Sequence, residues 1–140
     1  MGDISDHFSW VEFRCRDHAE TPVPDDLLAN VHGLVYGVLE PIHAEVGHPI
    51  EVLSGYRTAA HNRAVLGAPD SRHLYADAAD ICCARMTAET LWVMIRHLWR
   101  SNALPGLGGL GRYDGWVHVD ARPHEPGVLA QWDLRTPTGG

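Results

Sequence analysis

Apolar residues recur every three or four positions between residues 25 and 46, which is the periodicity of an amphipathic helix. They are Leu27, Leu28, Val31, Leu34, Val35, Val38, Leu39, Ile42 and Val46. Pro41 interrupts the segment and is expected to kink or divide the helix, because proline has no backbone N–H to donate. Gly47 is a suitable end for it. The pattern therefore predicts a main core helix over 25–46.

A second main helix is predicted after Thr87, which can cap its first turn, and it should end before Pro105. Its apolar face carries Leu91, Trp92, Ile95, Leu98 and Trp99. We also expect a short helix over 59–66, followed by a loop that leads to residues 71–73. These helices leave the intervening apolar runs as candidate strands.

Residues 49–53 and 78–83 are short apolar runs of the length expected for buried strands. Residues 108–113 and 116–120 form two further strands, because Asp114-Gly115 between them is a strong hairpin dipeptide. Strands interleaved irregularly with two main helices, and joined partly by hairpins, indicate an α+β fold with a mainly antiparallel sheet.

The length of 140 residues fits one small domain over 1–140. The tail after about residue 123 is rich in Pro, Gly and Thr. We expect it to be partly irregular, with residues 128–134 packing back on the domain. We expect the chain to be a monomer.

The charge narrows the classes of partner. Eleven Lys and Arg against 18 Asp and Glu give a formal net charge of -7, which disfavours binding to nucleic acid or to an anionic membrane. No apolar run approaches the ~20 residues that a membrane span needs, and residues 1–6 lack the basic and apolar regions of a secretion signal. We therefore expect no membrane insertion and no signal peptide in this chain.

Three cysteines, Cys15, Cys82 and Cys83, cannot all pair within one chain, and two adjacent cysteines are poor partners for each other. We expect reduced, structural thiols. The chain has no Cys-x-x-Cys spacing, so a metal site would have to be built from His and Asp.

The strongest candidates for metal binding are His73, Asp80 and His118. Asp80 lies in an apolar run, where an ionised carboxylate is costly unless a positive charge accompanies it. Two imidazoles and one carboxylate would leave the fourth position of a tetrahedral zinc site open, as in catalytic sites. Taken singly, each residue has an ordinary alternative role. Asp80 could be a buried carboxylate satisfied by backbone donors. His73 could be a loop histidine, and His118 could be a half-buried strand histidine.

Four segments carry a resemblance to a known family, in the family's own order. They are "HFSWVEFRC", "SGYRTAAHNRAVLGAPDSRH", "SRHLYADAAD" and "GLGRYDGWVHVDAR". The third is similar to the Ser-x-His-x-x-Gly-x-Ala-x-Asp signature of zinc D-Ala-D-Ala carboxypeptidases and related peptidoglycan endopeptidases. The wider group includes lysostaphin-type enzymes and the Hedgehog signalling domain. The resemblance spans roughly residues 7 to 122 and is more specific than any one motif.

The resemblance implies a D-Ala-D-Ala-peptidase-like fold with one Zn²⁺ per chain, held by His73, Asp80 and His118. It places Ser71 beside the ligands and assigns Ser71, Tyr56 and Arg57 to substrate binding. Arg57 would bind a carbonyl or carboxylate of the substrate and stabilise the developing oxyanion, for which its fixed, charged fork is suited.

The chain departs from the family pattern at three positions. Ala76 stands where the signature has glycine, which is acceptable if that backbone has ordinary dihedral angles. Asp77 stands at a position that is usually basic or polar. Gly115 replaces the acidic residue that several relatives carry three positions before the last histidine ligand.

The missing acid leaves the general base open. Asp120 lies two residues after His118 on the same strand face, so it could be the base or could orient His118. These two roles remain alternatives, with Asp114 as a third candidate base.

The function implied by the resemblance is amide hydrolysis in peptidoglycan stem peptides or cross-links, by a carboxypeptidase or an endopeptidase. A phage lysis enzyme (endolysin) is one such protein. It would be made in the cytoplasm and act on the cell wall after release through phage lysis, a phage tail or another export route. The alternative, motivated by Gly115, is a catalytically inactive, zinc-stabilised binding or structural module of the same fold.

Overall fold

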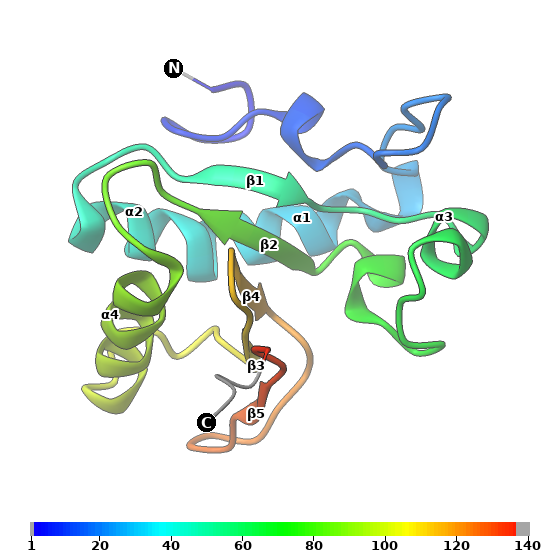
Figure 1. Ribbon diagram of the computed structural model, residues 1–140. Coiled ribbons are helices and arrows are strands. Elements are labelled where there is room, and N and C mark those ends of the chain that lie inside the picture. The colour runs from blue at the N-terminus through cyan, green and yellow to red at the C-terminus, as the bar shows by residue number, and fades with distance from the viewer. Residues whose placement is uncertain (1, 137–140) are drawn as a thin grey trace.

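The computed structural model describes residues 2–136, and within them five short strands form one sheet in the order β1-β2-β4-β3-β5 (Figure 1). The strands are β1 Glu51–Ser54, β2 Ala78–Cys82, β3 Gly109–Arg112, β4 Val117–Asp120 and β5 Ala130–Asp133. Only β5 runs parallel to its neighbour, β3, and the other pairs are antiparallel. The predicted α+β fold with a mainly antiparallel sheet is confirmed.

The helical elements lie mostly on one side of this sheet. In Figure 1, α1 and α2 lie behind β1 and β2, and α4 lies beside the sheet. The elements are η1 Trp10–Phe13, η2 Asp25–Leu27, α1 Leu28–Leu34, η3 Val35–Leu39, α2 Glu40–Val46, α3 Ala59–Ala64, η4 Arg72–Tyr75 and α4 Ala88–Arg100.

The long predicted helix is divided before its proline and not at it. A π-helical turn, η3, separates α1 from α2. Pro41 has no N–H to donate to the carbonyl of Gly37, four residues earlier, so regular α-helical bonding cannot continue through this turn. Gly47 adopts a left-handed conformation with φ 72° and ends α2 as predicted.

The core lies between the helices and one face of the sheet. Fully buried residues come from the long helical segment, from α4 and from the central strands, and include Val31, Leu34, Val38, Ile42, Ile81, Leu91, Ile95, Val117 and Val119. Because side chains alternate along a strand, the residues between these strand positions face the opposite side of the sheet. That side carries the polar site described below.

The tail returns to the domain, as expected for residues 128–134, and part of it forms a strand that was not predicted. β5 pairs with β3 and places Trp132 over Gly111. A Cβ at Gly111 would lie 2.4 Å from Trp132 Nε1, so only glycine leaves room for the indole ring. This contact brings an aromatic side chain to the middle of the sheet.

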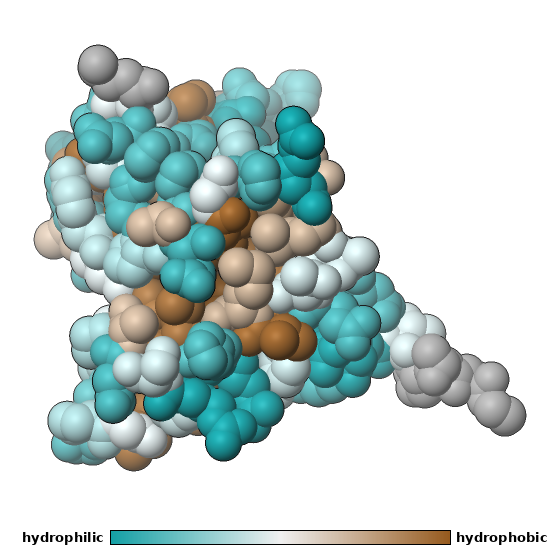
Figure 2. All heavy atoms as spheres, turned by 90° about the vertical axis from the view of Figure 1, so that its left-hand side faces the viewer, coloured by the Kyte–Doolittle hydropathy of each residue, from teal (hydrophilic) through white to brown (hydrophobic). Residues whose placement is uncertain are grey.

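Hydrophilic side chains surround a hollowed apolar band on the face shown in Figure 2.

Among residues 2–136, no helix is both long and apolar enough to cross a membrane. Cys15, Cys82 and Cys83 are all free thiols, as expected.

Candidate metal centre

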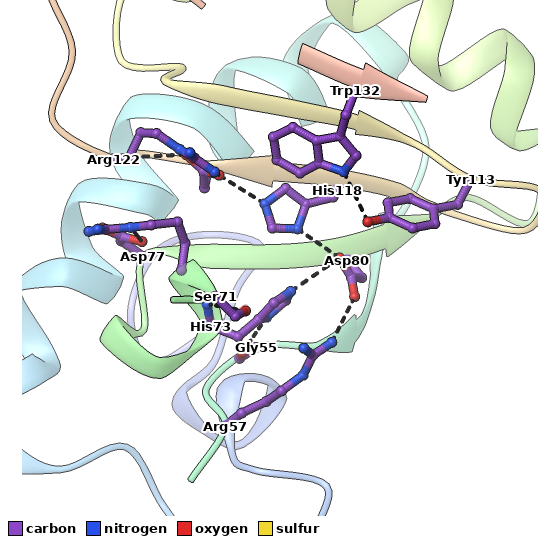
Figure 3. A network of polar contacts seen from close by, with 12 residues as sticks. Gly55, Arg57, Ser71, His73, Asp77, Asp80, Tyr113, His118, Arg122 and Trp132 are labelled. Atoms are coloured by element: carbon purple, nitrogen blue, oxygen red, sulfur yellow. Dashed lines mark hydrogen bonds and ion pairs between the residues drawn. The ribbon is translucent and has the colours of Figure 1, made fainter. Parts of the chain in front are cut away.

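His73, Asp80 and His118 lie together on the face of the sheet opposite the helices (Figure 3). Asp80 in β2 is the direct partner of His118 in β4, and His73 comes from the short turn η4. One ligand atom of each residue lies within 4.8 Å of the other two. All three residues are buried, with exposed fractions of 2%, 8% and 6%. The structure thus brings the three sequence candidates into one cluster.

The strand register explains the arrangement. Ser54, Asp80, His118, Gly111 and Trp132 form one row across the five strands, since each is the register partner of the next. The two polar residues at the centre of this row are therefore fixed by backbone pairing. Gly111 leaves the space beside them that the Trp132 ring fills.

Both imidazoles face the same carboxylate oxygen. Asp80 Oδ1 lies 3.3 Å from His73 Nε2 and 3.1 Å from His118 Nδ1. The far nitrogens are held as well: His73 Nδ1 is 2.7 Å from the carbonyl oxygen of Gly55, and His118 Nε2 is 2.9 Å from Asp120 Oδ2. Histidines that bind metals commonly donate their other N–H to a carbonyl or carboxylate in this way. The donor set therefore fits zinc.

The chain around His73 is held from two directions. Ser71 caps η4, because its hydroxyl oxygen accepts from the backbone N–H of His73 at 3.3 Å. The backbone N–H of Arg57 donates to the carbonyl of His73 at 3.0 Å. Gly55 approaches the N-terminal segment so closely that a Cβ would lie 2.8 Å from Phe13 Cα. These contacts fix the imidazole that faces Asp80.

The charges of the cluster favour an ionised carboxylate. Burial alone would raise the pKa of Asp80, but hydrogen bonds from His118 and His73 outweigh it and hold that pKa well below its usual value. Burial lowers the pKa of His73. Burial also opposes a charge on His118, but the carboxylates of Asp120 and Asp80 on its two sides prevail and raise its pKa. The site thus presents an anionic ligand to a cation.

Asp120 supports His118 from the side away from Asp80. Its carboxylate is fully buried and accepts hydrogen bonds from His118 Nε2 and from Arg122, through the backbone N–H at 3.1 Å, Nε at 2.9 Å and Nη2 at 2.7 Å. It does not line the cavity in front of the cluster. Of the two alternative roles for Asp120, this geometry favours orientation of His118.

Asp114 and Gly115 both lie in the exposed β3–β4 hairpin. Asp114 Oδ2 accepts from the backbone N–H and the hydroxyl of Thr136, and the residue does not line the cavity. A Cβ at Gly115 would meet nothing within 4 Å. The hairpin therefore presents no acid to the cluster.

A cavity of about 490 Å³ opens in front of the cluster. His73, Asp80 and His118 line it together with three arginines, Arg57, Arg72 and Arg122. Arg57 Nη2 lies 3.4 Å from Asp80 Oδ2, and its Nη1 lies 3.2 Å from the side-chain oxygen of the buried Asn62. Asn62 was not singled out from the sequence, since no local motif marks it; its Nδ2 donates to the carbonyl of Ala68 at 2.9 Å.

Arg57 and Ser71 line this cavity, but Tyr56 does not. The Tyr56 ring packs against the hydrophobic core, and its backbone N–H donates to the carbonyl of Phe13 at 2.9 Å. The Tyr56 side chain thus packs on the core and does not line the cavity in which Arg57 and Ser71 lie. Adjacent residues in an extended segment point to opposite sides, so Arg57 and Tyr56 cannot both face the cavity.

Aromatic residues missed by the sequence reasoning complete the cavity wall. The Trp132 ring lies 5.0 Å from the His118 ring, and its Nε1–H donates to the hydroxyl of Tyr113 at 2.9 Å. Tyr113 stacks on Trp116 at 4.8 Å. No local motif marks Trp132, because its place follows from the pairing of β5 with β3.

The two substitutions in the His73 motif have different consequences. Ala76 has φ 59° and ψ 23°, so the condition of ordinary dihedral angles is not met. This left-handed conformation suits glycine and strains alanine. Asp77 is buried and pairs with Arg72, whose Nε donates to Oδ1 at 3.1 Å. A basic partner inside the motif therefore balances the unusual acid.

The comparisons with known proteins agree with this geometry. The family model described as Peptidase M15 matches residues 6–120, which is most of the chain. No curated protein sequence matches it. The family match confirms the resemblance drawn from the four segments.

Proposed function

The chain belongs to the peptidase M15 family, and we propose that it is a zinc-dependent peptidase that hydrolyses amide bonds in peptidoglycan peptides. One observation carries the proposal: a buried His73, Asp80 and His118 cluster at the base of a cavity, with the far nitrogen of each imidazole already held. A preorganised donor set of this kind is what a catalytic metal requires.

In this proposal His73, Asp80 and His118 hold one Zn²⁺. The ion, when bound, supplies a Lewis acid that polarises the scissile carbonyl. Asp120 keeps His118 in the orientation that presents Nδ1 to the cluster, and the Gly55 carbonyl does the same for Nε2 of His73. Neither of these supports faces the substrate.

Arg57 is the residue we assign to the substrate's oxygen. Its side chain is buried except for 15%, it lines the cavity, and the carboxylate it contacts is that of Asp80. Arg72 and Arg122 also line the cavity, but each is paired with its own aspartate, Asp77 and Asp120. An arginine is always charged and suits a developing oxyanion or a carboxylate.

Tyr113 is the second group we place at the reacting bond. An indole N–H can only donate, so the Tyr113 oxygen accepts from Trp132 and its own proton is free to be donated into the cavity. We propose that this proton goes to an oxygen or a leaving amine of the substrate. Among the described residues that line the cavity, Asp70 is the one carboxylate outside the cluster, so it is the candidate to accept a proton from water.

The choice of peptidoglycan rests on the family. Stem peptides carry carboxylates, and Arg57 in the cavity wall suits them. We propose a carboxypeptidase or endopeptidase that works as a monomer and reaches the cell wall after release, for example as a phage lysis enzyme.

Tyr113→Phe and Asp70→Asn separate the two proposed proton-transfer roles, since each removes one acidic group and keeps the size of the side chain.

The test uses the purified chain. Zinc per chain is measured, and new amino groups are followed during incubation with purified peptidoglycan. We expect about one bound zinc at the cluster and cleavage, both lost in His73→Ala and both kept in His97→Ala, which changes an exposed histidine on α4. Zinc bound at the cluster with no cleavage of any peptidoglycan substrate would refute the peptidase and favour the zinc-stabilised module.

A further inference from the structure

The N-terminal segment, residues 4–10, contacts the helical segment of residues 28–46 at several points. The Tyr36 hydroxyl donates to the carbonyl of Ile4 at 2.7 Å. The ring of Trp10 meets the ring of His32 edge-on at 5.2 Å. The same two segments contribute a second group of potential metal ligands, formed by His7, Glu40 and His43.

The ligand atoms of these three residues meet the same distance limit as those of the first cluster, since one from each lies within 4.8 Å of the other two. His7 Nδ1 is 2.6 Å and 3.1 Å from the two oxygens of Glu40. The rings of His7 and His43 stack with centroids 3.7 Å apart and 20° between their planes. Glu40 and His43 are three residues apart in α2 and therefore share one face of that helix.

We infer that His7, Glu40 and His43 form a second metal site, which binds a divalent transition metal such as Zn²⁺ and fastens the N-terminal segment to α2. Two imidazoles and one carboxylate are the ligand types that zinc, nickel and copper prefer. His7 and Glu40 are 33 residues apart in the chain, so an ion bound to both would link two separate segments. The inference is independent of the proposed peptidase function.

A simple ion pair between His7 and Glu40 explains less of the geometry. It gives no reason for His43, whose ring nitrogens have no hydrogen-bonding partner among residues 2–136. A metal ion explains His43 as well, because its ring stacks on that of His7 and its free nitrogens lie beside the Glu40 carboxylate.

The site differs from the first cluster in its exposure. The side chain of His7 is 47% exposed and that of Glu40 is 19% exposed. The remaining coordination positions would therefore be open to water. We expect the ion to bind more weakly here and to be removed first by a chelator.

The experiment measures bound zinc on the full chain after saturation with zinc chloride and removal of the free ion. We expect about two zinc ions per wild-type chain, one in His43→Ala, one in Glu40→Gln and one in His73→Ala. His48→Ala is the matched control, because it removes an exposed histidine just after α2 and should leave two. Unchanged far-UV circular dichroism shows that each variant is folded.

A second readout does not depend on stoichiometry. Starting from protein with one zinc bound, added zinc should raise Tm by about 5 °C in the wild type and in His48→Ala, and not in His43→Ala. Cleavage of peptidoglycan should survive in His43→Ala, so failure of this site and failure of the peptidase proposal are distinguished. One zinc per wild-type chain that is lost in His73→Ala and kept in His43→Ala, or two in both His43→Ala and Glu40→Gln, would overturn the inference.

Discussion

Replacing Asp120 by asparagine isolates the support of the metal centre from the metal ligands themselves. The fully buried Asp120 carboxylate accepts from Nε2 of His118 and from three N–H groups of Arg122. Asparagine keeps the size and one oxygen, but it loses the negative charge and turns an N–H₂ group toward donors. Asp120→Asn should therefore weaken both the fold and the hold on His118.

The magnitude follows from the burial of the pair. Breaking a buried ion pair costs about 3–5 kcal/mol, but Arg122 retains 30% exposure and the introduced asparagine would still accept one bond. We expect a loss of about 2–3 kcal/mol in the free energy of unfolding, which lowers Tm by roughly 10 °C in a domain of this size. Zinc affinity should fall about 10- to 100-fold, as it does when the support of a metal-binding histidine is removed.

Asp133→Asn is the matched control. Asp133 and Arg135 repeat the geometry of Asp120 and Arg122, with the same distances of 3.1, 2.9 and 2.7 Å. The Asp133 side chain is 47% exposed and contacts no imidazole, so its loss should leave Tm and zinc affinity unchanged. Because the two pairs have the same distances, a difference between Asp120→Asn and Asp133→Asn reports the effect of burial and of the contact with His118.

The pH dependence gives a further check. The hydrogen bonds and charges of His118 and Arg122 outweigh burial and hold the pKa of Asp120 below its usual value in the folded chain. A depressed carboxyl pKa stabilises the fold above the pKa of the unfolded chain, about 4, and this contribution is lost as the pH falls further. The stability difference between wild type and Asp120→Asn should therefore shrink below about pH 4.

The assays are urea unfolding, zinc titration and turnover with excess zinc. If Asp120 orients His118, the zinc-saturated variant should keep turnover within about tenfold of the wild type. If Asp120 is instead the general base, turnover should fall about 10²- to 10⁴-fold even with zinc bound. Wild-type stability and zinc affinity together with such a fall would refute the orienting role.

Four other predictions concern single residues in and beside the site. Zinc binding should release more protons as the pH is lowered, because the carboxylates of Asp120 and Asp80 raise the pKa of His118 and its ligand nitrogen must be deprotonated to bind the ion; calorimetry in buffers of different ionisation enthalpy measures the release. Arg57→Ala should leave the zinc content unchanged and lower turnover, whereas an unaffected rate would remove Arg57 from the reaction. Ala76→Gly should change the free energy of unfolding by less than about 1 kcal/mol, because relief of the left-handed strain offsets the lost buried methyl group. Ala76→Val should cost about 2–3 kcal/mol, as measured by urea unfolding, because a branched side chain suits neither that backbone nor the space.

Local sequence patterns predicted much of the fold. The three-and-four spacing over residues 25–46 predicted a helical segment, and Gly47 ends it as expected. Asp114-Gly115 predicted the hairpin between β3 and β4. These features depend on residues close in the chain, where backbone geometry and side-chain alternation leave few options.

Other features of the fold could not be read from the spacing alone. The missing N–H of Pro41 acts one turn earlier, so the helix is divided at η3. The strand β5 has no strong pattern of its own and forms because β3 offers a free edge. Ala76 takes a left-handed conformation in the two-residue connection, Ala76 and Asp77, that leads from η4 into β2.

The sequence by itself determined the types and the order of the candidate ligands, since His73, Asp80 and His118 lie in motifs whose spacing belongs to one family. Only the tertiary structure decided what surrounds them. The pairing of β2 with β4 turns Nδ1 of His118 toward Asp80 and leaves Nε2 to Asp120, and the return of β5 adds Trp132. The helical packing likewise brings His7 to Glu40 and His43. Spacing along a strand or helix predicts which side chains share a face, whereas contacts between distant segments depend on how those faces pack.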